Sequence, residues 1–336
     1  MPGSSAWRGV QFEGGNAIHA ATGGQINFRR VFVKYNIVTW NMQGSGKNLG
    51  EQLGSLFLNV CKPDFVNIIC LQEFGSPEAL TALSDVATGN GYLCVQNVVQ
   101  VDGDTMEADV RYLFATNGLS ELFTFRLRVS WYEGDDNQRC GVGMLYQTSE
   151  NSTESWSLET FYESFGRRPV IRLNVTKTGF SPMSVLSVHA IANESDSVSQ
   201  IRNLCREVAD DACERVWDNG YFIIGGDFNQ TPEAAARVEE TKECRLEYPL
   251  SNSNDRTDEA YIYRTGKATQ GKRGARCREL DFFIVNAKVH KNINDFKMET
   301  CGTNTSDHDC VSLKFNMPSC EEEISKVLDR FDYGMF

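Results

Sequence analysis

Residues 221–229 read YFIIGGDFN, an apolar run that gives way to Gly-Gly-Asp-Phe-Asn. A short aromatic and β-branched run bounded by turn residues predicts a buried β-strand over Tyr221–Gly226. Asp227 and Asn229 follow this strand directly. Polar side chains at the end of a buried strand lie at the rim of a sheet, where their charge is not buried without a partner. The stretch therefore indicates a β-sheet protein with functional groups at a sheet rim.

Five further predicted strands carry polar residues in the same way. They are the segments Lys34–Trp40, Phe65–Gln72, Ser184–His189, Leu280–Val285 and Val311–Phe315. At or near their ends lie side chains able to bind metal ions or move protons, namely Asn41, Glu73, His189, Asp281, Asp307 and His308. We expect these side chains to converge with Asp227 and Asn229 on one rim of the fold.

Short strands with turn signals dominate the middle of the chain, at residues 91–99, 112–115, 140–146 and 170–175. Apolar residues at helical spacing predict two longer helices, over 47–61 and 197–217. Because strands outnumber helices and many are spaced as hairpins, we predict an α/β fold in which two mixed β-sheets pack together and are flanked by helices.

Composition excludes several classes of protein. The 336 residues are 41% hydrophobic and 23% charged, with no apolar run near the roughly 20 residues that span a bilayer. The formal net charge of −12 excludes a protein that holds nucleic acid by its overall field. One segment reverses this sign, because 264–278 contains six basic residues and no acidic one. We predict either a phosphate-binding loop, with contacts from Lys272 and Arg273, or a solvated loop.

Eleven cysteines without a CxxC pair give no support to a zinc-ribbon or thioredoxin-like site. Their even spread from Cys61 to Cys320 fits several disulfides in an oxidising compartment and fits buried thiols equally well. Residues 1–30 lack the apolar segment of a secretory signal. We therefore expect either an intracellular protein or a secreted one whose signal has been removed.

The residue types at this rim suit the hydrolysis of a phosphate ester. Carboxylate oxygens such as those of Glu73 and Asp307 are the ligands that Mg²⁺ and Mn²⁺ prefer, and such a cation neutralises charge on the phosphate. His189 and His308 are of the type that titrates near neutral pH, which suits a general acid and a general base. Asp281 is a candidate to orient one imidazole, as a carboxylate does in serine hydrolases.

Six motifs in this order, WNMQG, LQEFG, SVHAIAN, GGDFNQTP, LDFFIV and SDHDCV, resemble the endonuclease/exonuclease/phosphatase superfamily, which includes deoxyribonuclease I. The stretches TWNMQGS, LQEFGSP, RRPVIRL and VHAIAN are more similar to the catalytic B subunit of cytolethal distending toxin. The resemblance runs from about Val33 to Phe315. It implies a four-layer sandwich, and we predict a catalytic domain at 34–316. The polar, glycine-interrupted sequence at 1–33 predicts an irregular extension, and 317–336 is predicted to be a short acidic helical tail.

The resemblance also implies a role for each site residue. Three are implied ligands of Mg²⁺ or Mn²⁺: Glu73, Asn41 and Asp307. His308, oriented by Asp281, is implied as the base, and His189 either contacts the phosphate or protonates the leaving oxygen. Three others are implied to position the attacking water, the phosphoryl oxygens and a substrate phosphate: Asp227, Asn229 and Arg168.

The predicted function is thus a magnesium-dependent endodeoxyribonuclease that nicks DNA as the active subunit of a genotoxin-like system. A phosphoinositide phosphatase is the first alternative, because the same site permits it. A catalytically inactive binding protein of this fold is the second, and the complete set of site residues argues against it. The resemblance further implies delivery or binding subunits, secretion, and action in the nucleus of a target cell, with an intracellular enzyme as the alternative.

Overall fold

A computed structural model of the protein describes sixteen stretches of the chain. They are residues 31–44, 49–83, 85–88, 91–116, 119–133, 139–148, 154–162, 168–192, 200, 204, 220–235, 245–247, 260–264, 268–270, 278–299 and 306–321. All of them belong to one compact unit, Val31–Phe336. The predicted extension as far as Arg30, and the predicted tail from Glu322 onward, lie outside the described residues.

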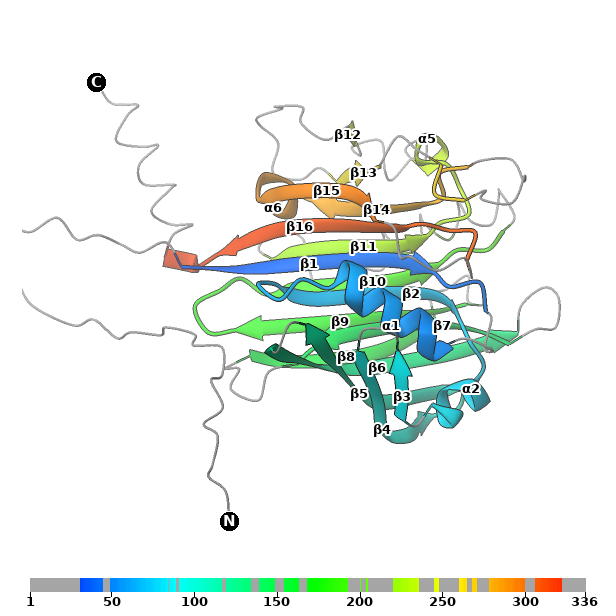
Figure 1. Cartoon of the computed structure of the whole chain (residues 1–336). Coiled ribbons are helices and arrows are strands. Elements are labelled where there is room, and N and C mark those ends of the chain that lie inside the picture. The colour runs from blue at the N-terminus through cyan, green and yellow to red at the C-terminus, as the bar shows by residue number, and fades with distance from the viewer. Residues whose placement is uncertain are drawn as a thin grey trace, which may run out of the picture. The chain divides into compact units, whose positions relative to one another are not determined.

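Strands dominate the described part of the chain (Figure 1). One group comprises β1 (Phe32–Asn41), β2 (Val66–Phe74), β3 (Asp85–Thr88), β4 (Gly91–Asp102), β5 (Thr105–Thr116), β6 (Leu119–Glu133), β7 (Arg139–Gln147), β15 (Ile293–Glu299) and β16 (Cys310–Pro318). These form a mixed sheet in the order β15-β16-β1-β2-β7-β6-β5-β4-β3. At its centre β1 runs parallel to β2 and antiparallel to β16, so the two ends of the described chain meet there.

The second sheet is also mixed. Its strands are β8 (Glu154–Tyr162), β9 (Pro169–Lys177), β10 (Met183–His189), β11 (Tyr221–Asp227), β12 (Arg245–Glu247), β13 (Ala260–Tyr263) and β14 (Asp281–Asn286). They are ordered β12-β13-β14-β11-β10-β9-β8. β10 and β11 are parallel, and β14 is antiparallel to β11.

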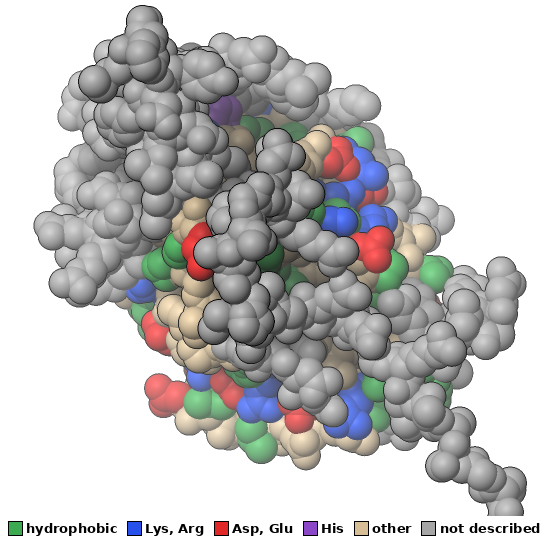
Figure 2. Space-filling view, turned by 90° about the vertical axis from the view of Figure 1, so that its left-hand side faces the viewer, with side chains coloured by type: hydrophobic (Ala, Val, Ile, Leu, Met, Phe, Trp, Pro, Cys, Tyr) green, Lys and Arg blue, Asp and Glu red, His purple; other side chains and the backbone are tan. Residues whose placement is uncertain are grey.

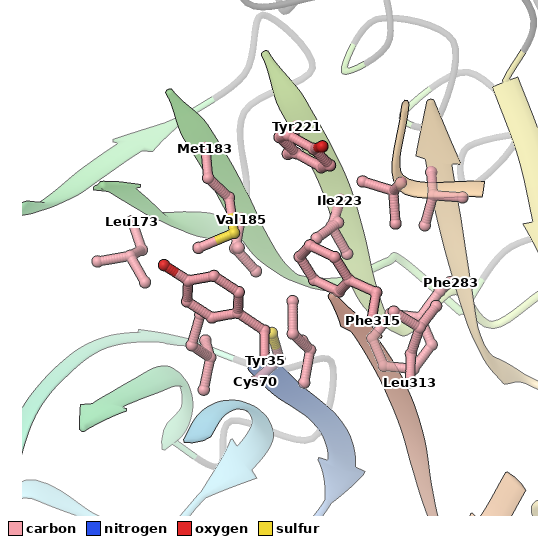
Figure 3. Close-up of a cluster of buried hydrophobic side chains, with 14 of the residues drawn as sticks. Tyr35, Cys70, Leu173, Met183, Val185, Tyr221, Ile223, Phe283, Leu313 and Phe315 are labelled. Carbon is pink, nitrogen blue, oxygen red and sulfur yellow. The ribbon is translucent and has the colours of Figure 1, made fainter. Parts of the chain in front are cut away.

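The sheets pack face to face through a continuous apolar core. Tyr35 from β1, Cys70 from β2 and Phe315 from β16 meet Val185 from β10 and Ile223 from β11 (Figure 3). All five side chains are fully buried. Successive side chains of a strand point to opposite faces of its sheet. The residues between those of this core therefore face outward, toward a second apolar layer.

Helical residues cover the outer faces and complete the predicted four layers. On the nine-stranded sheet, α1 (Leu49–Val60) buries Phe57 against Phe125, with the ring centres 4.9 Å apart. On the seven-stranded sheet, Leu204 packs with Phe222 and Ile284. Leu204 is helical and is one of two described residues of the predicted helix at 197–217. The other helices are short: α2 (Pro77–Ala82), α5 (Pro232–Ala235) and α6 (Ala287–Lys291).

The pairing of β1 with β16 extends past two of the predicted boundaries. Phe32 pairs with Pro318, and Val33 pairs with Met317. We predicted the domain to begin at 34, where the first strong strand pattern starts, and to end at 316. Mutual hydrogen bonding of the two strands satisfies the backbone at these positions and continues the ladder.

The two ends of the sheets differ in character. Where β16 finishes, basic and acidic side chains lie interspersed on the surface (Figure 2). At the opposite end, β1 and β11 finish together, because Asn41 and Asp227 are their last residues and are hydrogen-bonded to each other. The predicted site residues belong to this second end.

Candidate active site

Strand register brings three predicted site residues into line. In the seven-stranded sheet His189 on β10 lies beside Asp227 on β11, and Asp227 lies beside Asp281 on β14. From the other sheet, Asn41 Nδ2 donates to Asp227 Oδ2 at 2.9 Å. The site therefore spans the ends of both sheets, as the polar strand ends predict.

Two glycines allow β11 to carry Asp227 into this position. A Cβ atom on Gly226 would collide with the carbonyl oxygen of Val188, and one on Gly225 would lie 2.6 Å from the Phe283 ring. The adjacent strand and the core approach the backbone too closely for any side chain. Gly225 and Gly226 therefore set how near β10 and β14 come to Asp227.

Strained backbone surrounds the site. Three residues have left-handed conformations that disfavour a side chain: Gln43 (φ 59°), Glu73 (φ 48°) and Asn229 (φ 49°). At Glu73 the pairing of β2 with β7 shifts register between Leu71 and Phe74. Such a bulge re-aims side chains out of the strand's alternation. The left-handed conformation of Glu73 and the register shift beside it thus direct the Glu73 side chain toward the rim.

The Asn41 amide joins two carboxylates. Its Nδ2 donates to Glu73 Oε1 at 3.1 Å and to Asp227 Oδ2 at 2.9 Å. Its Oδ1 accepts from Gln43 N at 2.9 Å. Two neighbouring carboxylates repel each other, and a donor shared between them offsets that repulsion. Asn41 thus holds Glu73 and Asp227 together.

The loop carrying Asp307 and His308 is tied to the end of β1. Ser306 Oγ donates to Asn41 O at 2.7 Å and accepts from His308 N at 3.0 Å. Asp307 N donates to Gln43 Oε1 at 3.0 Å. Residues 265 positions apart in the chain are therefore fixed to each other at the site.

His308 is paired with a carboxylate. Its Nδ1 lies 2.6 Å from Asp281 Oδ2, and its Nε2 lies 3.9 Å from Asp227 Oδ2 and 3.6 Å from Asp307 Oδ1. Burial alone would lower the pKa of His308, but the charges of Asp281, Asp227 and Asp307 outweigh burial and raise this pKa to about 10. His308 therefore carries a proton on both ring nitrogens at neutral pH.

Asp227 lies at the centre of the site. Its Oδ2 is 3.9 Å from Nε2 of His189 and 3.9 Å from Nε2 of His308, and its Oδ1 accepts from Asn229 N at 2.8 Å. Burial, with the charge of Asp281, raises the pKa of Asp227 to about 7. A carboxyl group that titrates near neutral pH is suited to accept a proton during a reaction.

His189 has a different environment from His308. Its Nδ1 lies 2.7 Å from the Tyr132 hydroxyl, and its Nε2 lies 3.8 Å from Glu73 Oε1. Burial, reinforced by the positive charge of Arg168, holds the pKa of His189 well below its usual value. His189 is therefore neutral where His308 is charged, and the two imidazoles are not equivalent.

Arg168 and Asn229 hold the backbone beside His189. Arg168 Nη1 donates to Ala190 O at 2.5 Å, and Asn229 Nδ2 donates to the same oxygen at 2.7 Å. The Arg168 guanidinium also lies 5.0 Å from the centre of the Tyr132 ring. Both residues that we predicted are thus at the site. Arg168 is buried and contacts the protein rather than open solvent.

Most of the predicted phosphate-binding loop, including Lys272 and Arg273, lies outside the described residues. Arg264 is described and forms an ion pair with Glu279 at 2.9 Å. Thr269 connects the loop to the site, because its hydroxyl accepts from Asp281 N at 3.1 Å and its carbonyl oxygen accepts from Asp309 N at 2.8 Å. Gln270 also forms a β-bridge with His308, so these two described residues of the basic segment lie beside the site.

One compact group of possible metal ligands stands out in the described part of the chain. Single ligand atoms of Asp227, Asp281 and His308 lie within 4.8 Å of one another. The group is buried, however, and the contact between Asp281 and His308 already occupies one oxygen and one nitrogen. This group is better explained as a hydrogen-bonded pair beside a central carboxylate.

Glu73 and Asp307 are the accessible carboxylates. Their side chains are 31% and 16% exposed, and Asp307 Oδ1 is buried without a hydrogen-bond partner. Hard oxygen donors of this kind fit Mg²⁺ or Mn²⁺. The oxygen of Asn41, which we predicted as a further ligand, accepts from Gln43 N and keeps a second lone pair for a metal ion. Asn41 also positions Glu73 through its nitrogen.

Sequence reasoning missed several residues that shape the site. Gln43 and Ser306 stand inside the quoted motifs WNMQG and SDHDCV, but neither type signals a structural role there. Trp40 is fully buried, and its Nε1 donates to His308 O at 3.4 Å. Tyr132 lies in β6, a strand that we did not predict, and no motif marks it.

Comparison with known proteins agrees with this geometry. Residues 38–308 match the sequence model of the Endonuclease/Exonuclease/phosphatase family. The chain belongs to this family. No curated protein matches the chain. Family membership, together with a site of carboxylates and imidazoles, indicates an enzyme that hydrolyses phosphate esters.

Solved structures of similar fold bear out the resemblance. Cytolethal distending toxin from Actinobacillus actinomycetemcomitans is similar over 83% of this chain and 97% of that chain, at 20% identity and a TM-score of 0.52. CdtB, the biologically active subunit of cytolethal distending toxin, is similar over 83% of this chain and 96% of that chain, at 15% identity and a TM-score of 0.51. These likenesses confirm the predicted sandwich. Among the described helices, none combines the length and hydrophobicity of a membrane span.

Proposed function

We propose that this family member is a magnesium-dependent endodeoxyribonuclease that nicks DNA. The observation that carries the proposal is the convergence of three groups, because the Nε2 atoms of His189 and His308 both lie 3.9 Å from Asp227 Oδ2. In this arrangement, a carboxyl group that can accept a proton and two imidazoles that can donate face the same phosphate group of the substrate. A Mg²⁺ ion held by Glu73 and Asp307 would neutralise charge that develops on the phosphate and on the leaving oxygen.

Asp227 is the proposed base. It takes a proton from a water molecule as the water oxygen bonds to phosphorus. The bond from phosphorus to the leaving oxygen breaks, and this oxygen keeps the electron pair and takes a proton from solvent water. Its pKa of about 7 suits this transfer near neutral pH. His308 was the base that the resemblance implied, but its pKa of about 10 favours the protonated form. We therefore assign His308 to binding rather than to proton abstraction.

With Asp227 as the base, the two histidines would lie on the side of the attacking water and not on that of the leaving oxygen. An in-line displacement places the attacking and leaving oxygens on opposite sides of phosphorus. Both imidazoles neighbour Asp227 and hence the attacking water. We propose that both donate to phosphoryl oxygens that are not displaced, where preorganised donors stabilise developing charge. This replaces the acid and base pair of histidines expected from the sequence.

DNA is the proposed substrate because Thr269 and Gln270, which belong to the basic segment of an otherwise acidic chain, lie beside the site. The decisive experiment incubates the purified protein and Mg²⁺ with supercoiled plasmid and, in parallel, with a phosphoinositide in vesicles. We expect nicked circles without release of inorganic phosphate, and loss of nicking in Asp227→Asn. Phosphate release without nicking would identify a phosphoinositide phosphatase. Neither activity would indicate an inactive binding protein of this fold.

We also propose that the protein is secreted, is delivered by partner subunits and acts in the nucleus of a target cell. The disulfide-bonded state of Cys310 supports passage through an oxidising compartment, although Cys61 and Cys70 are buried thiols. Immunofluorescence of the protein in cells that express it, with cell fractionation, tests this proposal. Exclusive retention in the cytoplasm of the producing cell would contradict it.

A further inference from the structure

The two ring nitrogens of His189 meet partners of different chemistry. Nδ1 lies 2.7 Å from the Tyr132 hydroxyl. Nε2 faces two carboxylates, with Glu73 Oε1 at 3.8 Å and Asp227 Oδ2 at 3.9 Å. A neutral imidazole has one donor nitrogen and one acceptor nitrogen, and its partners determine which is which. The position of the proton on His189 therefore follows from these contacts.

The hydroxyl side requires Nδ1 to be an acceptor. Tyr132 is buried at 7% exposure, and a buried hydroxyl hydrogen needs an acceptor. Within the described part of the chain, His189 Nδ1 is the partner of this hydroxyl. If Nδ1 carried a proton, the phenol would have to accept it, and its own hydrogen would be buried without a partner. Such a loss costs about 1–3 kcal/mol.

The carboxylate side favours Nε2 as the donor without fixing it, because neither carboxylate oxygen, at 3.8 or 3.9 Å, is within hydrogen-bond distance. An ionised carboxylate accepts hydrogen bonds and donates none, so a lone pair on Nε2 would face negative charge. Arg168 reinforces the same arrangement. Its guanidinium lies 5.0 Å from the centre of the Tyr132 ring, and its positive charge makes the phenol a poorer acceptor and opposes a second proton on His189.

We propose that Tyr132 is a positioning residue that holds His189 as the tautomer with its proton on Nε2. His189 then presents a fixed neutral donor to a phosphoryl oxygen and does not transfer a proton. His308 differs, because the Asp281 carboxylate requires a proton on its Nδ1. The part that this donor plays toward phosphate rests on the proposed function, whereas the tautomer itself does not.

Nitrogen NMR of the full-length protein labelled with ¹⁵N-histidine tests the tautomer without any substrate. A ring nitrogen without a proton resonates far downfield of one that carries a proton, and His189→Gln identifies the signals. We expect Nδ1 of His189 to be unprotonated and Nε2 to be protonated. In Tyr132→Phe this single-tautomer pattern should be lost, because Nδ1 has no donor. A protonated Nδ1 in the native protein, or an unchanged pattern in Tyr132→Phe, would overturn the proposal.

Tyr146→Phe is the matched control. The Tyr146 hydroxyl is equally buried in the core between the sheets and donates to Glu154 Oε2 at 2.7 Å. Glu154 is opposite Lys177 in the pairing of β8 with β9, and Lys177 lies at the end of β9 that is farther from Arg168. Both variants lose one buried hydroxyl contact of the same length, so similar destabilisation is expected in both. Only Tyr132→Phe should alter the His189 signals.

Substitution of His189 itself tests the part that rests on the proposed function. The amide nitrogen of glutamine reaches the position of Nε2, whereas that of asparagine reaches only the position of Nδ1. We expect His189→Gln to nick plasmid about tenfold or more faster than His189→Asn, which is the contribution of a hydrogen bond to a charged group. Equal rates would show that the Nε2 donor does not act on phosphate. A wild-type protein without nicking would refute the proposed function and leave the NMR result to decide the tautomer.

Discussion

Replacement of Asp281 by asparagine tests the strongest electrostatic contact in the site. Asp281 Oδ2 lies 2.6 Å from His308 Nδ1, and both side chains are buried. Asparagine has nearly the same shape but no charge, so the substitution leaves no cavity. The pKa of His308, now about 10, should fall toward or below its usual value of 6.5 once this charge is removed.

The size of the effect follows from the linkage between protonation and folding. The folded-state pKa of His308 exceeds the unfolded value, so the native state keeps a proton that the unfolded chain releases. The resulting stabilisation is complete below pH 6.5 and is lost as the pH rises toward 10. One proton changes the free energy of unfolding by about 1.4 kcal/mol per pH unit in this window. Between pH 7 and 9 the wild type should lose about 2–3 kcal/mol through this group.

Urea unfolding followed by tryptophan fluorescence, in EDTA and at several pH values from 7 to 9, provides the assay. Buried thiols such as Cys61 also destabilise the native state in alkali, but both proteins contain them. The difference between the two curves therefore isolates His308. We expect the stability of Asp281→Asn to be nearly flat after this correction. Parallel curves for the two proteins would refute the reasoning that Asp281 holds the proton on His308.

Three other substitutions test separate parts of the account. Glu73→Gln should abolish magnesium-dependent nicking while the melting temperature stays near that of the wild type, and normal turnover in a magnesium titration would exclude Glu73 as a ligand. Gly226→Ala should lower the free energy of unfolding by about 1–3 kcal/mol through collision with Val188, whereas Gly143→Ala, with its nearest atom at 3.3 Å, should lower it less in the same urea assay. The third test converts four basic loop residues to glutamine, namely Lys267, Lys272, Arg273 and Arg276. It should flatten the salt dependence of DNA binding by up to about 0.9 per lost contact and leave cleavage of a small chromogenic phosphodiester unchanged. Equal losses on both substrates would indicate that the loop has a structural role.

Local pattern was sufficient to predict the central strands and the rim of the site. β1 and β11 are largely apolar, buried runs that end in Asn41 and Asp227, and burial of such runs leaves their polar ends at one edge. The helical spacing at 47–61 likewise predicted α1. These features depend on neighbours in sequence, so the sequence alone carries them.

Features that depend on distant partners were not predictable in this way. β6 is not among them, because apolar and polar residues alternate from Phe123 to Trp131, which is the pattern of a strand with one buried face that we overlooked. Arg126 and Arg128 lie at polar positions of this pattern and pair with Glu107 on β5. The different protonation of the two histidines does depend on distant partners. His189 meets Tyr132, 57 positions away, and His308 meets Asp281, 27 positions away. No local pattern specifies which partner each imidazole meets.

The most direct test of the central claim is the rate at which the purified protein converts supercoiled plasmid to nicked circles in Mg²⁺. The comparison includes the wild type, His189→Ala, His308→Ala and the double variant. Removal of one preorganised donor costs about 10²–10³ in rate, and the two donors act on one phosphate. We predict losses of that size in each single variant and a combined loss smaller than their product. Single variants that nick as fast as the wild type would contradict the account.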